Sequence, residues 1–183
     1  MDGEAADWLA EQEAETARRW QPFVDAFLEC VPEVRASLEQ ESDGERARRF
    51  TPADLWIQVV TDLLDNDDYP ARVHADVWPR ILAFLEVAEE LAELLSTESQ
   101  HEDATTAEGF VSSGILCDVT RNVAGLQELL PWMGPRTVAA ARGEVECHGR
   151  SRAGTYERVD WSVAGNRFVP LAGLQAEQLH PID

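Results

Sequence analysis

Through most of its first 143 residues the chain repeats apolar side chains every three or four positions, which is the spacing of one helix face. These repeats lie in four segments: Phe23, Val24, Phe27, Leu28 and Val31; Leu55, Ile57, Val59, Val60, Leu63 and Leu64; Ile81, Leu82, Phe84, Leu85, Ala88, Leu91, Leu94 and Leu95; and Phe110, Val111, Ile115, Leu116, Val119, Val123, Leu126 and Leu130. They predict an all-α fold, a compact bundle of about six helices.

Helix boundaries are marked by proline, glycine and capping residues. Thr51-Pro52-Ala53-Asp54 is the clearest start, because threonine caps, proline suits the first helical position and a carboxylate follows in the first turn. A second start is expected near Asp76. Residues 96–105 are predicted to be a polar linker before one long helix over about 106–130.

The stretch "LLPWMGPRTVAAARG" (129–143) is predicted to hold the boundary between two helices and not a binding loop. Gly134-Pro135 is expected to open the last helix, which should close at Gly143. Trp132 and Met133 are then predicted to be buried anchors of the turn.

After Gly143, β-branched and aromatic residues separated by glycines replace the helical pattern. They predict a short extended or β-hairpin segment, with strands near 155–163 and 166–170 and a turn at 164–166. The expected organisation is an acidic helical domain over 1–143 and a C-terminal appendage over 144–183 packed on it.

Charge is distributed unevenly along the 183 residues, whose formal net charge is −20. Residues 1–108 hold 27 acids and 8 arginines, whereas residues 109–183 hold 8 acids and 7 arginines. Nucleic acid is therefore excluded as a direct ligand, because binding phosphate needs a basic surface. A basic protein is the partner that such a surface attracts.

Cellular location follows from the cysteines and the apolar runs. Three cysteines without a CxxC pair favour a reduced, cytoplasmic setting. Residues 1–20 lack the features of a signal peptide, and no apolar stretch approaches the roughly 18 residues of a membrane span. We therefore expect no membrane association.

Motifs for catalysis or metal binding are weak, so no catalytic residue, metal or cofactor is expected. The four histidines have no zinc-site spacing, and adjacent Cys147 and His148 would diverge. The 65–68 turn lacks the glycine and closing glutamate of a calcium loop. Ser112-Ser113-Gly114 lies mid-helix, outside the context of a nucleophile elbow.

Two groups of acids are the candidate partner-binding residues: the turn around 62–68 and the helix face over 86–93, which is expected to be solvated because it lies opposite the apolar stripe. Their members are Asp62, Asp65, Asp67, Asp68, Glu86, Glu89, Glu90 and Glu93.

The order of the segments resembles a helical family of bacteria whose members are often encountered as immunity proteins beside polymorphic toxins. The resemblance covers about residues 23–140, and its more specific parts are Phe84-Leu85-Glu86 ("FLE") and Met133–Thr137 ("MGPRT"). It implies a helical fold with a shared structural corner at the glycine-proline turn. Members of the family lack an agreed activity, so the resemblance does not imply catalysis.

Together these observations predict a non-enzymatic immunity-type inhibitor that binds and masks a cognate basic toxin through its acidic surface. One alternative is a DNA-mimicking decoy that blocks a nucleic-acid-binding effector. Another is a structural or assembly subunit with Trp132, Trp161 and Phe168 as apolar contacts. An enzyme would need a pocket with convergent polar groups, which a sequence does not reveal.

Overall fold

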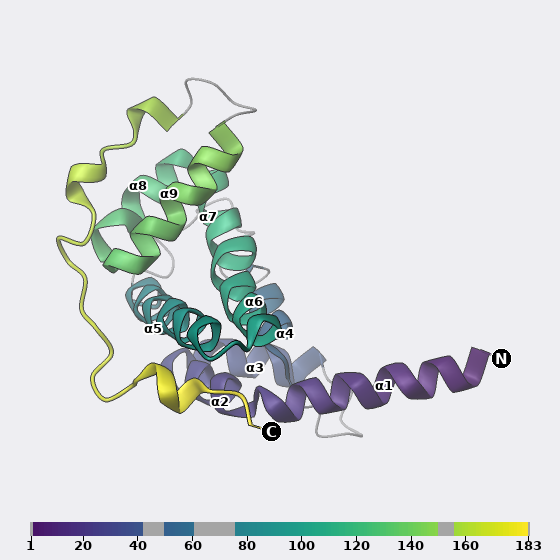
Figure 1. Ribbon diagram of the computed structural model, residues 1–183. Coiled ribbons are helices and arrows are strands. Elements are labelled where there is room, and N and C mark those ends of the chain that lie inside the picture. The colour runs from purple at the N-terminus through teal and green to yellow at the C-terminus, as the bar shows by residue number, and fades with distance from the viewer. Residues whose placement is uncertain (1, 42–49, 61–75, 150–155, 183) are drawn as a thin grey trace.

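A helical bundle built around one central helix forms the body of the protein (Figure 1). The computed structural model describes residues 2–41, 50–60, 76–149 and 156–182. The α-helices are α1 (Asp2–Arg19), α2 (Gln21–Cys30), α3 (Pro32–Glu41), α4 (Pro52–Val59), α5 (Trp78–Thr97), α6 (His101–Gly109), α7 (Cys117–Arg121), α8 (Val123–Leu129) and α9 (Pro135–Gly149). A π-helical segment, η2 (Phe110–Leu116), joins α6 to α7. The predicted all-α class is confirmed.

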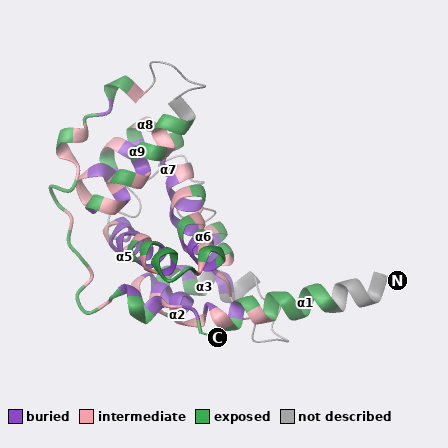
Figure 2. Ribbon diagram, viewed as in Figure 1, coloured by how far each residue is buried: buried purple, intermediate pink, exposed green. Residues whose placement is uncertain are grey.

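The central helix is α5, which contacts α2, α6, η2 and α9. Every residue from Ile81 to Ala88 is buried, so this stretch is enclosed on all sides rather than along one stripe (Figure 2). A helix surrounded in this way must be apolar nearly all round. Glu86 is the one charged residue in the stretch.

Four phenylalanines join α5 to its neighbours in the core. Phe23 and Phe27 of α2, Phe84 of α5 and Phe110 of η2 pack edge to face, with ring centroids 5.1 to 6.3 Å apart. Edge-to-face contacts place the positive edge of one ring against the negative face of another, which adds to the burial of apolar area. The cluster fixes α2 and η2 against α5.

The start of α4 follows the sequence prediction. Thr51 Oγ1 accepts from the Asp54 backbone N–H at 3.3 Å, and Asp54 Oδ2 accepts from the Thr51 N–H at 2.8 Å. Burial within the helix differs in part from the prediction. Leu55 and Val59 are buried, but Ile57 is 55% exposed and does not belong to the core.

Two expectations for residues 96–130 are wrong. The expected linker over 96–105 contains the first half of α6, which packs on α5 through Ala104 and Ala107. The expected single helix over 106–130 passes through η2 and ends at Asn122, whose backbone is extended. The Asn122 side chain then caps α8 by accepting from the Gly125 N–H at 3.1 Å. A side chain that competes for backbone N–H groups at this point restarts the helix.

The last helix starts at Pro135 as predicted, but it continues to Gly149 instead of closing at Gly143. An interior glycine costs a helix only about 1 kcal/mol relative to alanine. Buried Ala141 and half-buried Val145 carry the apolar face of α9 past Gly143, which explains the continuation.

A largely extended tail with short 3-10 turns follows α9. These turns are η4 (Tyr156–Arg158), η5 (Trp161–Val163) and η6 (Ala176–Leu179), and the described residues 156–182 contain no strand. The expected hairpin is therefore wrong over these residues. Its backbone groups bond to the body instead: the Gly165 and Arg167 N–H groups donate to carbonyls of the 130–131 corner, and the Ile182 N–H donates to the carbonyl of Arg19.

We predict that Phe84→Ala lowers the free energy of unfolding by about 3–5 kcal/mol, because it removes a ring from the centre of the aromatic cluster. Urea unfolding followed by circular dichroism measures the change. Ile57→Ala is the control, because removing a mostly exposed side chain should change the free energy of unfolding by no more than about 0.5 kcal/mol. Equal losses in the two variants would contradict this description of the core.

Candidate functional site

The start of α9 is held by a carboxylate from α5. The first backbone N–H groups of a helix have no partner within the helix. Here the N–H groups of Arg136 and Thr137 donate to Glu86 Oε1 and Oε2, at 3.0 and 2.9 Å. The Thr137 hydroxyl donates to Glu86 Oε2 at 3.0 Å. A carboxylate is favoured at this end of a helix, where the aligned peptide dipoles leave a partial positive charge.

Gly134 makes this close approach possible. A Cβ atom at position 134 would collide with the carboxylate and Cγ of Glu86. Pro135 then occupies the first helical position, where a missing N–H costs nothing. The "FLE" and "MGPRT" segments, singled out separately in the sequence, therefore form a single corner between α5 and α9.

The prediction that Glu86 belongs to a solvated face is wrong. Its side chain is only 7% exposed and lies among buried residues. The sequence spacing groups Glu86 with Glu89, Glu90 and Glu93, but α9 covers the first of these and leaves the other three more open. Burial is tolerated because three hydrogen bonds replace the lost water.

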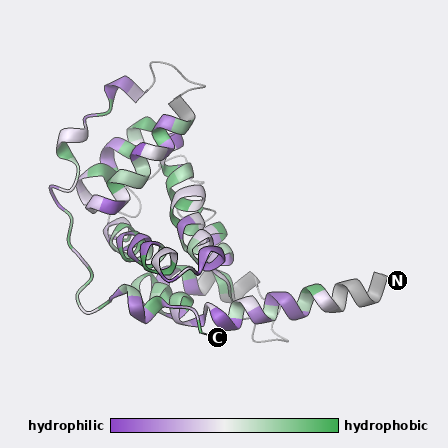
Figure 3. Cartoon of the chain, viewed as in Figure 1, coloured by the Kyte–Doolittle hydropathy of each residue, from purple (hydrophilic) through white to green (hydrophobic). Residues whose placement is uncertain are grey.

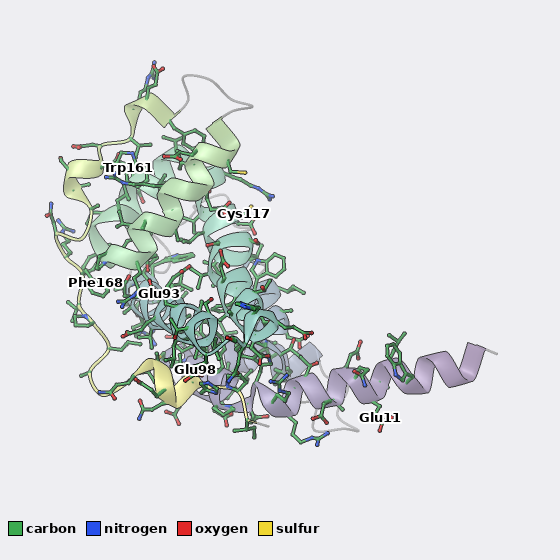
Figure 4. All side chains as sticks on the ribbon, in the orientation of Figure 1. Glu11, Glu93, Glu98, Cys117, Trp161 and Phe168 are labelled. Atoms are coloured by element: carbon green, nitrogen blue, oxygen red, sulfur yellow. The ribbon has the colours of Figure 1, made fainter. Side chains whose placement is uncertain are left out.

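Beside this corner lies a cleft of about 850 Å³ between α5, α6, η2 and α9. Figure 1 shows how α5, α6 and α9 are arranged, and Glu93, one of the residues that line the cleft, is labelled in Figure 4. The described residues that line it are Glu89, Glu93, Thr105, Glu108, Gly109, Ser112, Ser113, Pro135, Arg136, Ala139, Ala140, Gly143 and Glu144. We call this the α5–α9 cleft.

The α5–α9 cleft is acidic, and Glu89 shows it most clearly. Burial and then the negative charge of Glu108 raise the pKa of Glu89 to about 7, against a weaker opposing effect of the Ser112 hydroxyl. The Ser112 Oγ lies 3.5 Å from Glu89 Oε1. Glu89 thus gains or loses its proton near neutral pH, and a cation placed beside it would favour the charged form.

Arg136 is the only basic residue among the described residues that line the cleft. Its guanidinium contacts Glu93 at 3.2 Å and approaches Glu86 and Glu90 at 3.7 Å each. Four glutamates line the cleft, and this one arginine is shared with two more acids of α5. The site can therefore take guanidinium or ammonium groups.

The candidate residues from the sequence fall into three groups. Glu89 and Glu93 line the cleft, and Glu90 is exposed next to them. Glu86 belongs to the α9 corner. Asp62, Asp65, Asp67 and Asp68 lie outside the described residues.

Sequence reasoning missed Glu108 of α6 and Glu144 of α9, which also line the cleft. They are distant in the chain from Glu89, and no local pattern links them. Only the packing of α6 and α9 against α5 brings these carboxylates together.

Two of the three aromatic residues proposed as assembly contacts, Trp132 and Trp161, make contacts within the chain. Arg167 of the tail stacks on the Trp132 ring at 5.6 Å, and Arg142 of α9 stacks on Trp161 at 4.8 Å. Trp132 and Phe168 are half-buried, whereas Met133 is fully buried as predicted. Cation–π contacts of this kind hold the tail against the body.

In the part of the chain that the structure describes, no three His, Cys, Asp or Glu side chains are grouped to hold a metal ion. Within the same residues, no helix is both long and apolar enough to cross a membrane. Comparison with protein-family models, with curated proteins and with solved structures finds no significant match to this chain.

We predict that Glu86→Gln destabilises the fold by about 1–3 kcal/mol. The Arg136 and Thr137 N–H groups use different oxygens of Glu86, and glutamine replaces one of them with an NH2 donor and carries no charge. Chemical unfolding measures the loss. Glu90→Gln is the matched control on the exposed side of α5, and it should change stability by less than about 0.5 kcal/mol. A Glu86→Gln variant as stable as the wild type would show that this corner does not hold α9.

Glu89 gives the stability a pH dependence of opposite sign to that of most carboxylates. Its pKa is raised in the folded protein from 4.5 to about 7, so between these values the folded state binds more protons than the unfolded state. The contribution of Glu89 is fully present below pH 4.5 and is lost as pH rises through about 7. Subtracting the unfolding free energies of Glu89→Gln from those of the wild type, from pH 4 to 8, should reveal this fall. A flat difference would contradict the raised pKa.

Proposed function

We propose that this protein is a non-enzymatic immunity-type inhibitor, which binds a basic toxin protein through the α5–α9 cleft and masks it. The observation that supports the proposal most is the convergence of Glu89, Glu93 and Glu108 on one cleft, where Arg136 is the only basic residue among the described residues of the lining. Glu144 lies in the same lining. Carboxylates from three helices held in one concave site suit the arginine or lysine side chains of a partner.

The electrostatics of the whole chain favour the same kind of partner. A net charge of −20 attracts basic proteins over distances of about a Debye length and repels nucleic acid. Long-range attraction of this kind mainly raises the association rate, whereas buried charge pairs at the contact fix its orientation. The diffuse charge and the cleft therefore have separate roles in recognition.

The carboxylate of Glu89 would bind a cation in the cleft more favourably than it binds water. Its carboxylate is half-buried, and its pKa of about 7 shows that ionisation there is costly without a partner. A guanidinium placed in the cleft would compensate that cost. A cytoplasmic location of the protein, where thiols stay reduced, is part of the proposal. It is supported by the three cysteines, none of which is in a disulfide: Cys30, Cys117 and Cys147.

The test begins with affinity capture from a lysate of the native host, elution over a salt gradient and identification by mass spectrometry. We expect a basic protein that is released only at high salt, and whose toxicity in cells is suppressed when this chain is co-expressed. Capture of a nucleic-acid-binding effector that DNA displaces would instead favour the decoy function. Self-association that salt does not affect would favour a structural or assembly role.

With the captured partner purified, we predict that the double variant Glu89→Gln/Glu108→Gln weakens binding by about tenfold or more, because these charges lie in the cleft. The matched control is Glu29→Gln/Glu128→Gln, which removes the same charge from exposed positions outside the cleft lining. Calorimetry at fixed ionic strength measures both. Equal losses would show that binding depends on diffuse charge and not on the cleft.

A further inference from the structure

Helix α1 extends away from the body, and its described side chains have few neighbours until its last turn (Figure 1). All residues from Trp8 to Ala14 are exposed (Figure 2). Trp8 and Leu9 are 59% and 54% exposed, and they belong to the few large apolar side chains that the described part of the chain leaves in water.

Trp8 and Leu9 form a short exposed apolar stripe, and the Trp8 side of this stripe faces away from the attachment point of α1. At 3.6 residues per turn, Trp8 and Ala17 are nine positions and about half a turn apart. Ala17 is buried where α1 joins the body, so Trp8 points to the opposite side of the helix. Folding the arm back along its present contact would not cover Trp8.

Acids border the stripe on both edges. By helical spacing, Glu11 and Glu15 lie beside Trp8, and Glu13 lies on the far side of Leu9. Glu11 is labelled on the projecting helix in Figure 4, and hydrophilic colouring interrupted by apolar residues runs along the described part of α1 in Figure 3. The sequence has no basic residue before Arg18. Arg18 itself pairs with Glu15.

A helix that projects in this way is expected to gain stability by packing against a partner. A helix of this length without tertiary contacts is marginal in water, and most helical stability in proteins comes from packing an amphipathic face. Tryptophan is also the residue most enriched among the side chains that dominate binding energy at protein interfaces. A stripe of tryptophan and leucine, with Glu11 and Glu15 on one side and Glu13 on the other, fits an apolar groove lined on both sides by lysine or arginine.

The negative charge around Trp8 and Leu9 indicates which kind of partner could bind the stripe. A second copy of this chain, which carries its own net charge of −20, would be repelled from the acidic borders of the stripe. Anionic lipid headgroups would be repelled for the same reason. A basic protein is the occupant for which both the apolar stripe and its acidic borders are complementary.

We infer that α1 is a second contact arm of the inhibitor, which places Trp8 and Leu9 in an apolar groove bordered by basic residues on the toxin that the cleft engages. This inference rests on the proposed function and adds a separate surface to it. The arm and the cleft belong to one chain, so each contact raises the effective concentration of the other.

The experiment measures binding of the captured basic protein, purified, to full-length variants by calorimetry. Trp8→Ala/Leu9→Ala should weaken binding by about tenfold or more. Alanine is the best helix former, so the loss would not come from unfolding of α1. Ile57→Ala/Val169→Ala is the matched control, because it removes exposed apolar side chains elsewhere and should leave binding unchanged. Trp8→Phe should restore most of the affinity.

The outcomes separate the arm from the proposed function. If the cleft variant loses binding and the arm variant does not, the arm inference is overturned while the inhibitor function stands. If the wild type binds no basic protein, both fall. If Trp8→Ala/Leu9→Ala converts a dimer to a monomer in sedimentation, or abolishes binding to vesicles of anionic lipid, the stripe serves a second copy or a membrane, and the inference is wrong.

Discussion

The position of α9 against α5 depends on a buried carboxylate that caps a helix from another part of the chain. Glu86 is the charged residue within the fully buried stretch of α5, and it is tolerated there because α9 presents its unpaired N–H groups to it. Neither partner could be buried alone at low cost. The interaction therefore fixes where α9 begins, how close it comes to α5 and in which direction it leaves.

This corner also creates the α5–α9 cleft. Because α9 is held at its first turn, its next turns diverge from α5 and leave Ala139, Ala140 and Glu144 facing the α6–η2 segment across open space. The glutamates of α5 thus divide into two kinds within two helical turns. Glu86 serves the fold, whereas Glu89 and Glu93 face the cleft, where the proposed recognition of cations would take place.

Much of the fold could be predicted from local sequence, since helix starts and apolar faces are local properties. Thr51 and Pro135 were placed correctly because capping residues and proline act within one turn. The break at Asn122 and the start of α6 within a polar stretch were not predicted. The break depends on the Asn122 side chain, which competes for a backbone N–H group, and the start of α6 depends on buried contacts of its alanines with α5. The spacing of apolar residues along the sequence shows neither of these.

The site was less predictable than the fold, for a physical reason. The spacing of Glu86, Glu89, Glu90 and Glu93 places them on one side of a helix, but it does not say which of them another helix will cover. Glu108 and Glu144 join the cleft only through tertiary packing. The acids of the 62–68 turn lie outside the described residues, so their proposed role stays a prediction.

Hydrogen exchange at single-residue resolution tests the capping of α9 by Glu86 most directly. Backbone amides at a helix start usually exchange quickly, because they have no partner within the helix. The structure predicts that the amides of Arg136 and Thr137 exchange slowly, whereas those of Glu102 and Asp103, at the start of α6 where Gln100 provides no side-chain cap, exchange fast. Equally fast exchange at both helix starts would contradict the buried carboxylate as the constraint that places α9 against α5.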